Sequence, residues 1–79
     1  MTSRLHEDTI DMERRHVREA EVWIARQVEI VAQLDLMGAD DFALKARELL
    51  ALFREFLTFA RERLDYLERT LSSKPPASN

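Results

Sequence analysis

The stretch Leu34–Ala43, LDLMGADDFA, decides the fold because it contains Gly38, the only glycine among 79 residues. A glycine readily adopts the left-handed conformation that ends a helix. The two prolines stand at positions 75 and 76, in the C-terminal stretch SSKPPASN, so neither of these helix-breaking residue types interrupts the rest of the chain. The sequence therefore predicts an all-α fold, an antiparallel two-helix hairpin that turns at Gly38.

The ends of the two predicted helices carry capping signals. Asp40 is suited to cap the second helix, and Asp41 adds negative charge beside the positive end of the helix dipole. Several residues could cap the first helix: Thr2, Ser3, Asp8 and Thr9. The predicted organisation is a flexible N-terminus over residues 1–8, helices over about 9–37 and 40–72, and a disordered tail over 73–79.

Apolar residues recur with heptad spacing along both segments, as in coiled coils. An antiparallel hairpin about Gly38 pairs residues whose numbers sum to about 77. The predicted layers join Leu34 with Ala43, Val31 with Ala46, Ala20 with Leu57, and Val17 with Ala60. Each layer sets a large side chain against a small one, which favours close packing.

Both helices have apolar residues beyond those that one neighbouring helix covers. These flanking residues are Trp23, Ile30 and Met37 in the first helix, and Leu49, Phe56, Leu52, Phe59 and Tyr66 in the second. A short chain with so much surplus apolar surface predicts a homodimer, with two hairpins forming a four-helix bundle. The alternative is that Trp23 and Phe59 are merely exposed or fold over their own hairpin.

The predicted dimer interface consists of Trp23, Gln27, Ile30, Leu49 and Phe56. Gln27 is the polar member, at a core heptad position between Ile24 and Val31. A buried amide costs stability unless it is hydrogen-bonded. We expect Gln27 to fix the register by pairing across the dimer axis or with a backbone group, and the other reading is that it lines a ligand cavity.

Composition excludes several classes of protein. The chain has no cysteine, which removes disulfide scaffolds, cysteine-ligated zinc and iron–sulfur clusters. The first residues, MTSRLHE, lack the apolar core of a signal peptide, and no stretch approaches the roughly 20 apolar residues that span a bilayer. We therefore expect a cytoplasmic protein that does not enter membranes. The net charge of −3 disfavours nucleic acid as a partner.

Glu13 and His16 form a Glu-x-x-His pair, and bundles that bind two iron ions carry this pair on two of their helices. A dimer of hairpins would supply two such pairs. The second helix offers Arg63 and Leu64 at the same level, so the competing interpretation is a Glu13–Arg63 ion pair with His16 at its rim. We expect this second arrangement, and no metal or other cofactor.

A group of arginines gathers at the end of the hairpin opposite Gly38. Its members are Arg14, Arg15, Arg18, Arg61 and Arg63. This end is a candidate site for an anion such as RNA. Acidic residues interleave with the arginines at spacings of four, as in Asp11–Arg15 and Asp65–Arg69, which indicates ordinary solvated ion pairs instead.

The sequence offers no converging nucleophile, base and oxyanion donor, so we expect no enzymatic activity. The predicted function is a homodimeric helical module for interaction or assembly, in which the bundle surface or the arginine end contacts an unidentified protein. The alternatives are an RNA-binding hairpin dimer and, third, a carboxylate–histidine metal bundle.

Three short motifs resemble a pattern found in short bacterial helical-hairpin proteins. They are Ile24-Ala25-Arg26-Gln27, Gly38-Ala39-Asp40, and Leu49-Leu50-Ala51-Leu52-Phe53. The resemblance spans about residues 12–67 and implies the hairpin but no activity. The architecture is also similar to that of the small RNA-binding hairpin dimers that control plasmid copy number, a likeness of fold alone.

Overall fold

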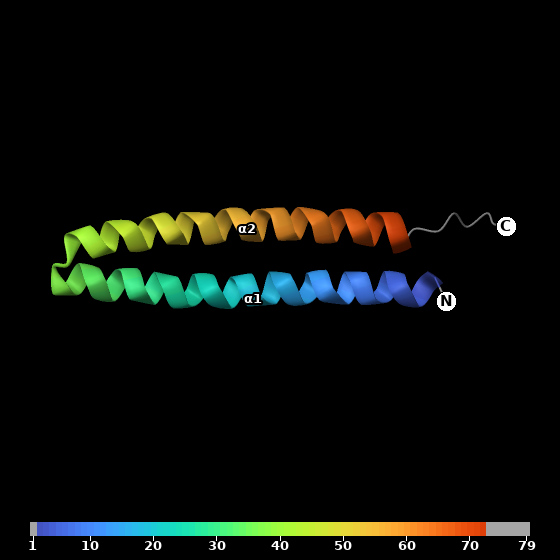
Figure 1. Ribbon diagram of the computed structural model, residues 1–79, viewed down its shortest axis with the longest axis horizontal. Coiled ribbons are helices and arrows are strands. Elements are labelled where there is room, and N and C mark those ends of the chain that lie inside the picture. The colour runs from blue at the N-terminus through green and yellow to red at the C-terminus, as the bar shows by residue number, and fades with distance from the viewer. Residues whose placement is uncertain (1, 73–79) are drawn as a thin grey trace.

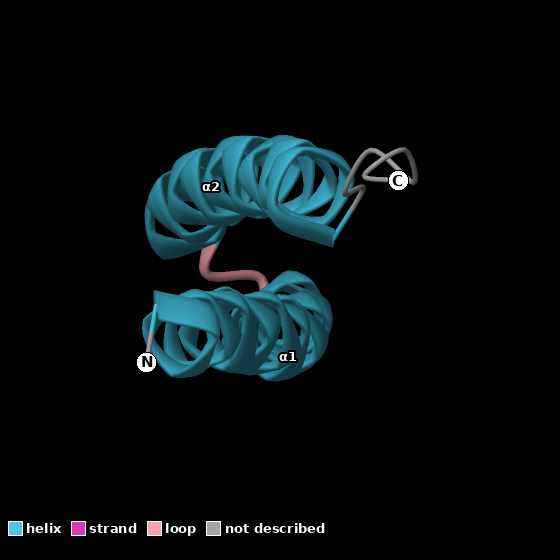
Figure 2. Cartoon of the chain, turned by 90° about the vertical axis from the view of Figure 1, so that its right-hand side faces the viewer, coloured by secondary structure: helices cyan, strands magenta, loops and turns pink. Residues whose placement is uncertain are grey.

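Two long helices make up the structure, a computed structural model that describes residues 2–72, with side chains for 8–71. Helix α1 (Thr2–Met37) and helix α2 (Asp40–Ser72) run antiparallel, so Thr2 and Ser72 lie at the same end of the rod (Figure 1). Viewed end-on, the described chain is a pair of helices with no further layer (Figure 2). The predicted all-α hairpin is confirmed, while the predicted tail, 73–79, lies outside the described residues.

Helix α1 begins at Thr2, seven residues before the predicted start near Thr9. The segment that was expected to be a flexible N-terminus therefore contributes residues 2–8 to the helix. This segment contains neither proline nor glycine. Each residue added to an existing helix gains a hydrogen bond without a new nucleation step, which favours the extension. With 36 and 33 residues, the helices are about 54 and 50 Å long.

The turn is built on Gly38, which has the positive φ of 74° that the sequence predicts. The Gly38 amide donates to the Asp35 carbonyl at 3.1 Å, and the Ala39 amide donates to the Leu34 carbonyl at 3.0 Å. These two bonds are the Schellman motif, which satisfies the last carbonyl groups of a helix. Gly38 therefore ends α1 and sends the chain back along it.

Helix α2 spans the predicted residues, 40–72, but Asp40 is not its N-cap. The Ala39 carbonyl accepts the Ala43 amide at 2.8 Å, so Ala39 stands at the N-cap position. Asp40 and Asp41 both lie in the first turn of α2. The prediction that Asp40 caps the helix was therefore wrong by one position, and both carboxylates act on the helix dipole instead.

The register of the hairpin agrees with the prediction. Contacts that cross between the helices include Gln27 with Ala46, Glu13 with Arg63, Trp23 with Phe53, and Glu21 with Arg61. The residue numbers in these pairs sum to 73, 76, 76 and 82. They bracket the predicted sum of about 77, so the heptad pattern located the facing residues correctly.

The core between the helices is thin. Its buried apolar residues are Ile10, Ala20, Ala43, Ala46, Leu50 and Ala60. Four of these six are alanines, and no large side chain among residues 8–71 is fully buried. Small residues let the helices approach closely, but they remove little apolar area from water. The hairpin therefore leaves most of its larger apolar side chains outside its own core.

Candidate functional site

One long side of the hairpin is apolar, and we refer to it as the apolar face. Its residues are Met12, Trp23, Ile30 and Met37 from α1, and Phe42, Leu49, Leu52, Phe56, Phe59 and Tyr66 from α2. All ten have exposed side chains, with 40 to 43% exposure at Trp23, Ile30, Leu49 and Phe56. So many exposed apolar side chains mark an interaction site more often than a solvated surface.

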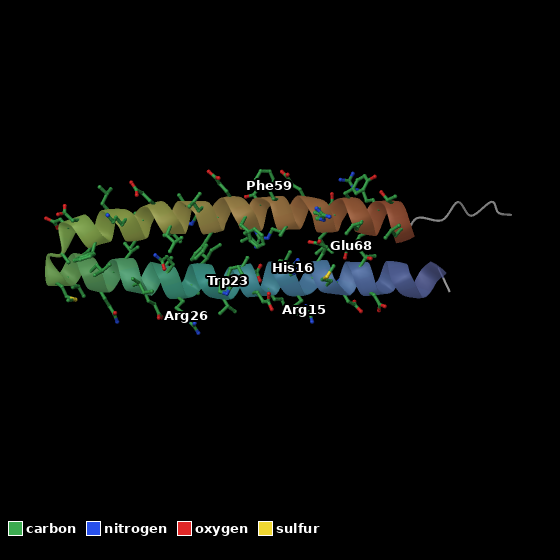
Figure 3. The ribbon with its side chains drawn as sticks, viewed as in Figure 1. Arg15, His16, Trp23, Arg26, Phe59 and Glu68 are labelled. Carbon is green, nitrogen blue, oxygen red and sulfur yellow. The ribbon has the colours of Figure 1, made fainter. Side chains whose placement is uncertain are left out.

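Trp23 anchors the middle of the apolar face. Its ring centre lies 6.0 Å from those of Phe53 and Phe56, at interplanar angles of 44° and 33°. The side chain projects into the space between the helices (Figure 3). Trp23 thus covers part of its own hairpin, as one of the two alternatives for this residue requires, but 41% of it still faces solvent.

The opposite side of the hairpin is closed by ion pairs. Arg14 bonds to Glu68 at 2.9 Å, Glu21 to Arg61 at 2.8 Å, and Asp35 to Arg47 at 2.5 Å. Each pair joins α1 to α2, and all these side chains are partly exposed. The two sides of the hairpin therefore differ in chemistry: one carries the ion pairs together with exposed Val28 and Leu44, and the other is mainly apolar.

At the end near the chain termini, the apolar face widens into an open groove of about 780 Å³. Its lining includes Met12, Phe56, Phe59 and Tyr66, with polar side chains from Glu13, His16, Glu62 and Arg63. The Glu13 carboxylate is 8% exposed and accepts from Arg63 Nε at 3.0 Å, while His16 Nδ1 lies 3.7 Å away. The groove is therefore a continuation of the apolar face around one buried ion pair.

This ion pair is the arrangement that we expected for Glu13 and His16. The structure forms the expected Glu13–Arg63 pair and places half-buried His16 beside it. Among residues 8–71 of one chain, no three acidic or histidine side chains come together in a way that could hold a metal ion. Within one hairpin, the Glu13 carboxylate therefore already has an arginine partner.

The arginine end does not gather free cations. Arg14, Arg61 and Arg63 bond to Glu68, Glu21 and Glu13 respectively. Of the i to i+4 pairs that the sequence suggests, Asp65–Arg69 forms, whereas Arg61 reaches across to α1. Arg15 points away from α2 (Figure 3). In the described chain, Arg15 and Arg18 keep no carboxylate partner and are exposed on α1, so three of the five arginines are paired and two are not.

Gln27 does not join the apolar face, although we expected it in the dimer interface. It is 6% exposed, and its Nε2 donates to the Ala46 carbonyl at 2.9 Å. The backbone partner was one of the two expected ways of fixing the register, and the small Ala46 side chain leaves room for the amide. The other four predicted interface residues, Trp23, Ile30, Leu49 and Phe56, do lie together on the apolar face.

Phe42 and Met12 extend the apolar face beyond the predicted residues. Phe42 stands seven positions before Leu49 and fourteen before Phe56, so the heptad repeat contained the signal for it. Met12 follows no such repeat, because the residue seven positions later is Glu19. Its place in the groove depends on how α1 packs against Tyr66 and Phe59 of α2.

Comparison of the chain with family models, with curated proteins and with solved structures finds no match. The resemblance to short bacterial hairpin proteins therefore stays a prediction. No helix within residues 2–72 is both long and apolar enough to cross a membrane.

Proposed function

We propose that the chain is a homodimeric assembly module, in which two hairpins pack through their apolar faces into a four-helix bundle. The proposal rests on one observation, the uncovered apolar face beside a core made largely of alanine. Burying the exposed part of a side chain such as Leu49 or Phe56 contributes about 1 kcal/mol. A second copy carries the same apolar face, so a single interface buries the apolar faces of both hairpins.

The distribution of charge supports a second copy as the partner. The ion pairs of the opposite side satisfy one another within a single hairpin, so that side needs no further contact. A two-fold dimer buries the same surface on both copies and leaves no apolar face exposed. In this proposal the protein has no catalytic step, and its product is the assembled bundle.

Two leucines of α2 provide a matched test. Leu49 lies on the apolar face, whereas Leu44 is an exposed leucine on the side that bears the ion pairs. We expect Leu49→Glu to raise the dimer dissociation constant by about 100-fold or more, because the new carboxylate loses its water in the interface. Leu44→Glu should leave the dissociation constant unchanged. Sedimentation equilibrium measures both, and equal effects of the two substitutions would contradict the proposed interface.

A further inference from the structure

The pattern of residues along the margins of the apolar face specifies how the second copy is oriented. We propose that the two hairpins dock end for end, with their Gly38 turns at opposite ends, and that the two-fold axis passes through the apolar face beside Trp23 and Phe56. This inference rests on the homodimer proposed above and adds its orientation.

Two symmetric arrangements are available to a pair of hairpins that meet face to face. If the turns lie at opposite ends, α1 packs on α1 of the second copy and α2 packs on α2. If the turns lie at the same end, each α1 packs on α2 of the second copy. The two arrangements therefore bring different margins of the apolar face together.

The two margins differ in character. Along α1 the margin carries Glu19 and Arg26, seven residues apart, and along α2 it carries Leu52 and Phe59, also seven apart. Arg26 and Phe59 point outward at opposite edges of the hairpin (Figure 3). The apolar face thus has a charged margin on α1 and an apolar margin on α2.

With the turns at opposite ends, each margin meets its own kind. Glu19 faces Arg26 of the second copy, and Arg26 faces its Glu19, giving two ion pairs. Along the other margin, Leu52 meets Phe59 of the second copy, and Phe59 meets its Leu52. Charge is matched with opposite charge and apolar surface with apolar surface.

A single axis satisfies both margins, which is the strongest support for this orientation. The midpoint of Glu19 and Arg26 falls between positions 22 and 23, and the midpoint of Leu52 and Phe59 falls between positions 55 and 56. The Trp23 ring lies 6.0 Å from the rings of both Phe53 and Phe56, so position 23 is level with the stretch of α2 between them, beside the midpoint of Leu52 and Phe59. The axis that centres one pair therefore centres the other.

Among more distant residues, one pair obeys the same symmetry and one does not, since Met12, seven positions before Glu19, would face Gln33 of the second copy. Lys45 and Tyr66 are centred between positions 55 and 56, which sets an ammonium beside an aromatic ring. The two copies of Glu55 would also face each other, and their repulsion disfavours this orientation. The effect is small, because both carboxylates lie at the solvated rim.

The other arrangement mismatches the margins. With both turns at the same end, Glu19 lies opposite Phe59 of the second copy, and Arg26 lies opposite its Leu52, since these pairs fall at the same level of the hairpin. A charged group pressed against apolar side chains loses water without gaining a partner. The end-for-end arrangement avoids this cost.

Charge exchange tests the orientation. In Glu19→Arg, and likewise in Arg26→Glu, both contacts across the α1 margin join like charges. The dimer of each variant should therefore have a dissociation constant about tenfold higher than that of the original chain. The double variant Glu19→Arg/Arg26→Glu should return to the value of the original chain. An equimolar mixture of the two single variants should form heterodimers, because both of its contacts are complementary.

The matched control uses Asp11→Arg and Arg18→Glu. These residues carry the same charges as Glu19 and Arg26 and are also seven positions apart, but they lie on α1 away from the apolar face. This pair should show neither the loss nor the preference for heterodimers. If the original chain dimerises but the Glu19/Arg26 variants and the Asp11/Arg18 variants change the dissociation constant equally, the orientation is wrong and the homodimer is still supported. An original chain that sediments as a monomer would overturn both.

Cross-linking gives a second readout, since the chain has no cysteine of its own. Val22→Cys alone should form covalent dimers with a short thiol cross-linker, because the two copies of Val22 lie near the axis on adjacent helices. With the turns at the same end, the two α1 helices are diagonal, and cross-linking would instead require a mixture of Val22→Cys and Glu55→Cys. That second result would contradict the proposal.

Discussion

At the scale of single residues, two buried polar side chains have internal partners. Gln27 donates to the Ala46 carbonyl, and the Glu13 carboxylate accepts from Arg63. Among the described residues, no buried side-chain nitrogen or oxygen lacks a hydrogen-bond partner. The two contacts lie at different levels of the hairpin and permit only one register, because an unpaired buried amide or carboxylate is costly.

The Glu13–Arg63 pair yields a prediction about stability. Arg63→Gln removes the cation beside a carboxylate that is 8% exposed, and we expect the free energy of unfolding to fall by about 1–2 kcal/mol. The loss is moderate because the Arg63 side chain is itself 70% exposed. Urea unfolding at a fixed protein concentration measures it.

The control for this prediction is the double variant Glu13→Gln/Arg63→Gln. It removes the buried charge together with its partner, so most of the lost stability should return. If Arg63→Gln unfolds at the same urea concentration as the original chain, the ion pair does not hold this end of the hairpin.

At the scale of elements, the hairpin depends on one backbone conformation. Gly38 has a φ of 74°, and a side chain added there would meet no atom within 4 Å. A substitution would therefore be strained by its backbone conformation and not by a clash. The Schellman bonds to Asp35 and Leu34 hold that conformation in place.

Substitutions at Gly38 should follow the cost of the left-handed conformation. We expect Gly38→Ala to lower the free energy of unfolding by about 1 kcal/mol. Gly38→Asn should cost less, because asparagine enters this region more readily than other residues. Thermal unfolding compares the two variants, and a loss from asparagine as large as that from alanine would contradict the argument.

The sequence predicted the helices and their register because both depend on local signals. A lone glycine set the turn, and the heptad spacing set which residues face each other. The start of α1 at Thr2 had no such signal, since four residues between positions 2 and 9 could each have capped the helix. The partner of Gln27 was not fixed either, because an amide at a core position is satisfied equally by a backbone carbonyl or by a second chain.

The ion-pair partners of long side chains could not be predicted from local sequence signals either. Arg61 has Asp65 four residues ahead on its own helix, yet it bonds to Glu21 of α1. Both carboxylates are within reach of a flexible arginine, so only the packing of the helices decides between them. For the same reason, the sequence predicted the Glu13–Arg63 pair but not that Arg14 bonds to Glu68 and Arg61 to Glu21.

At the scale of the whole molecule, the structure has one charged side, one apolar face and a thin core between them. The charged side is satisfied within the hairpin, and the apolar face is not. Two copies that join through this face would form a bundle with a core of its own. The Glu19–Arg26 and Leu52–Phe59 margins would then determine which way round the copies meet.

The central claim is that this chain associates with itself through the apolar face. Sedimentation equilibrium of the unmodified protein at micromolar concentration tests it most directly. We predict a mass of twice the 9.3 kDa of the single chain, with dissociation on dilution described by one monomer–dimer equilibrium. A mass of 9.3 kDa at every concentration, from protein that still unfolds cooperatively on heating, would contradict the claim.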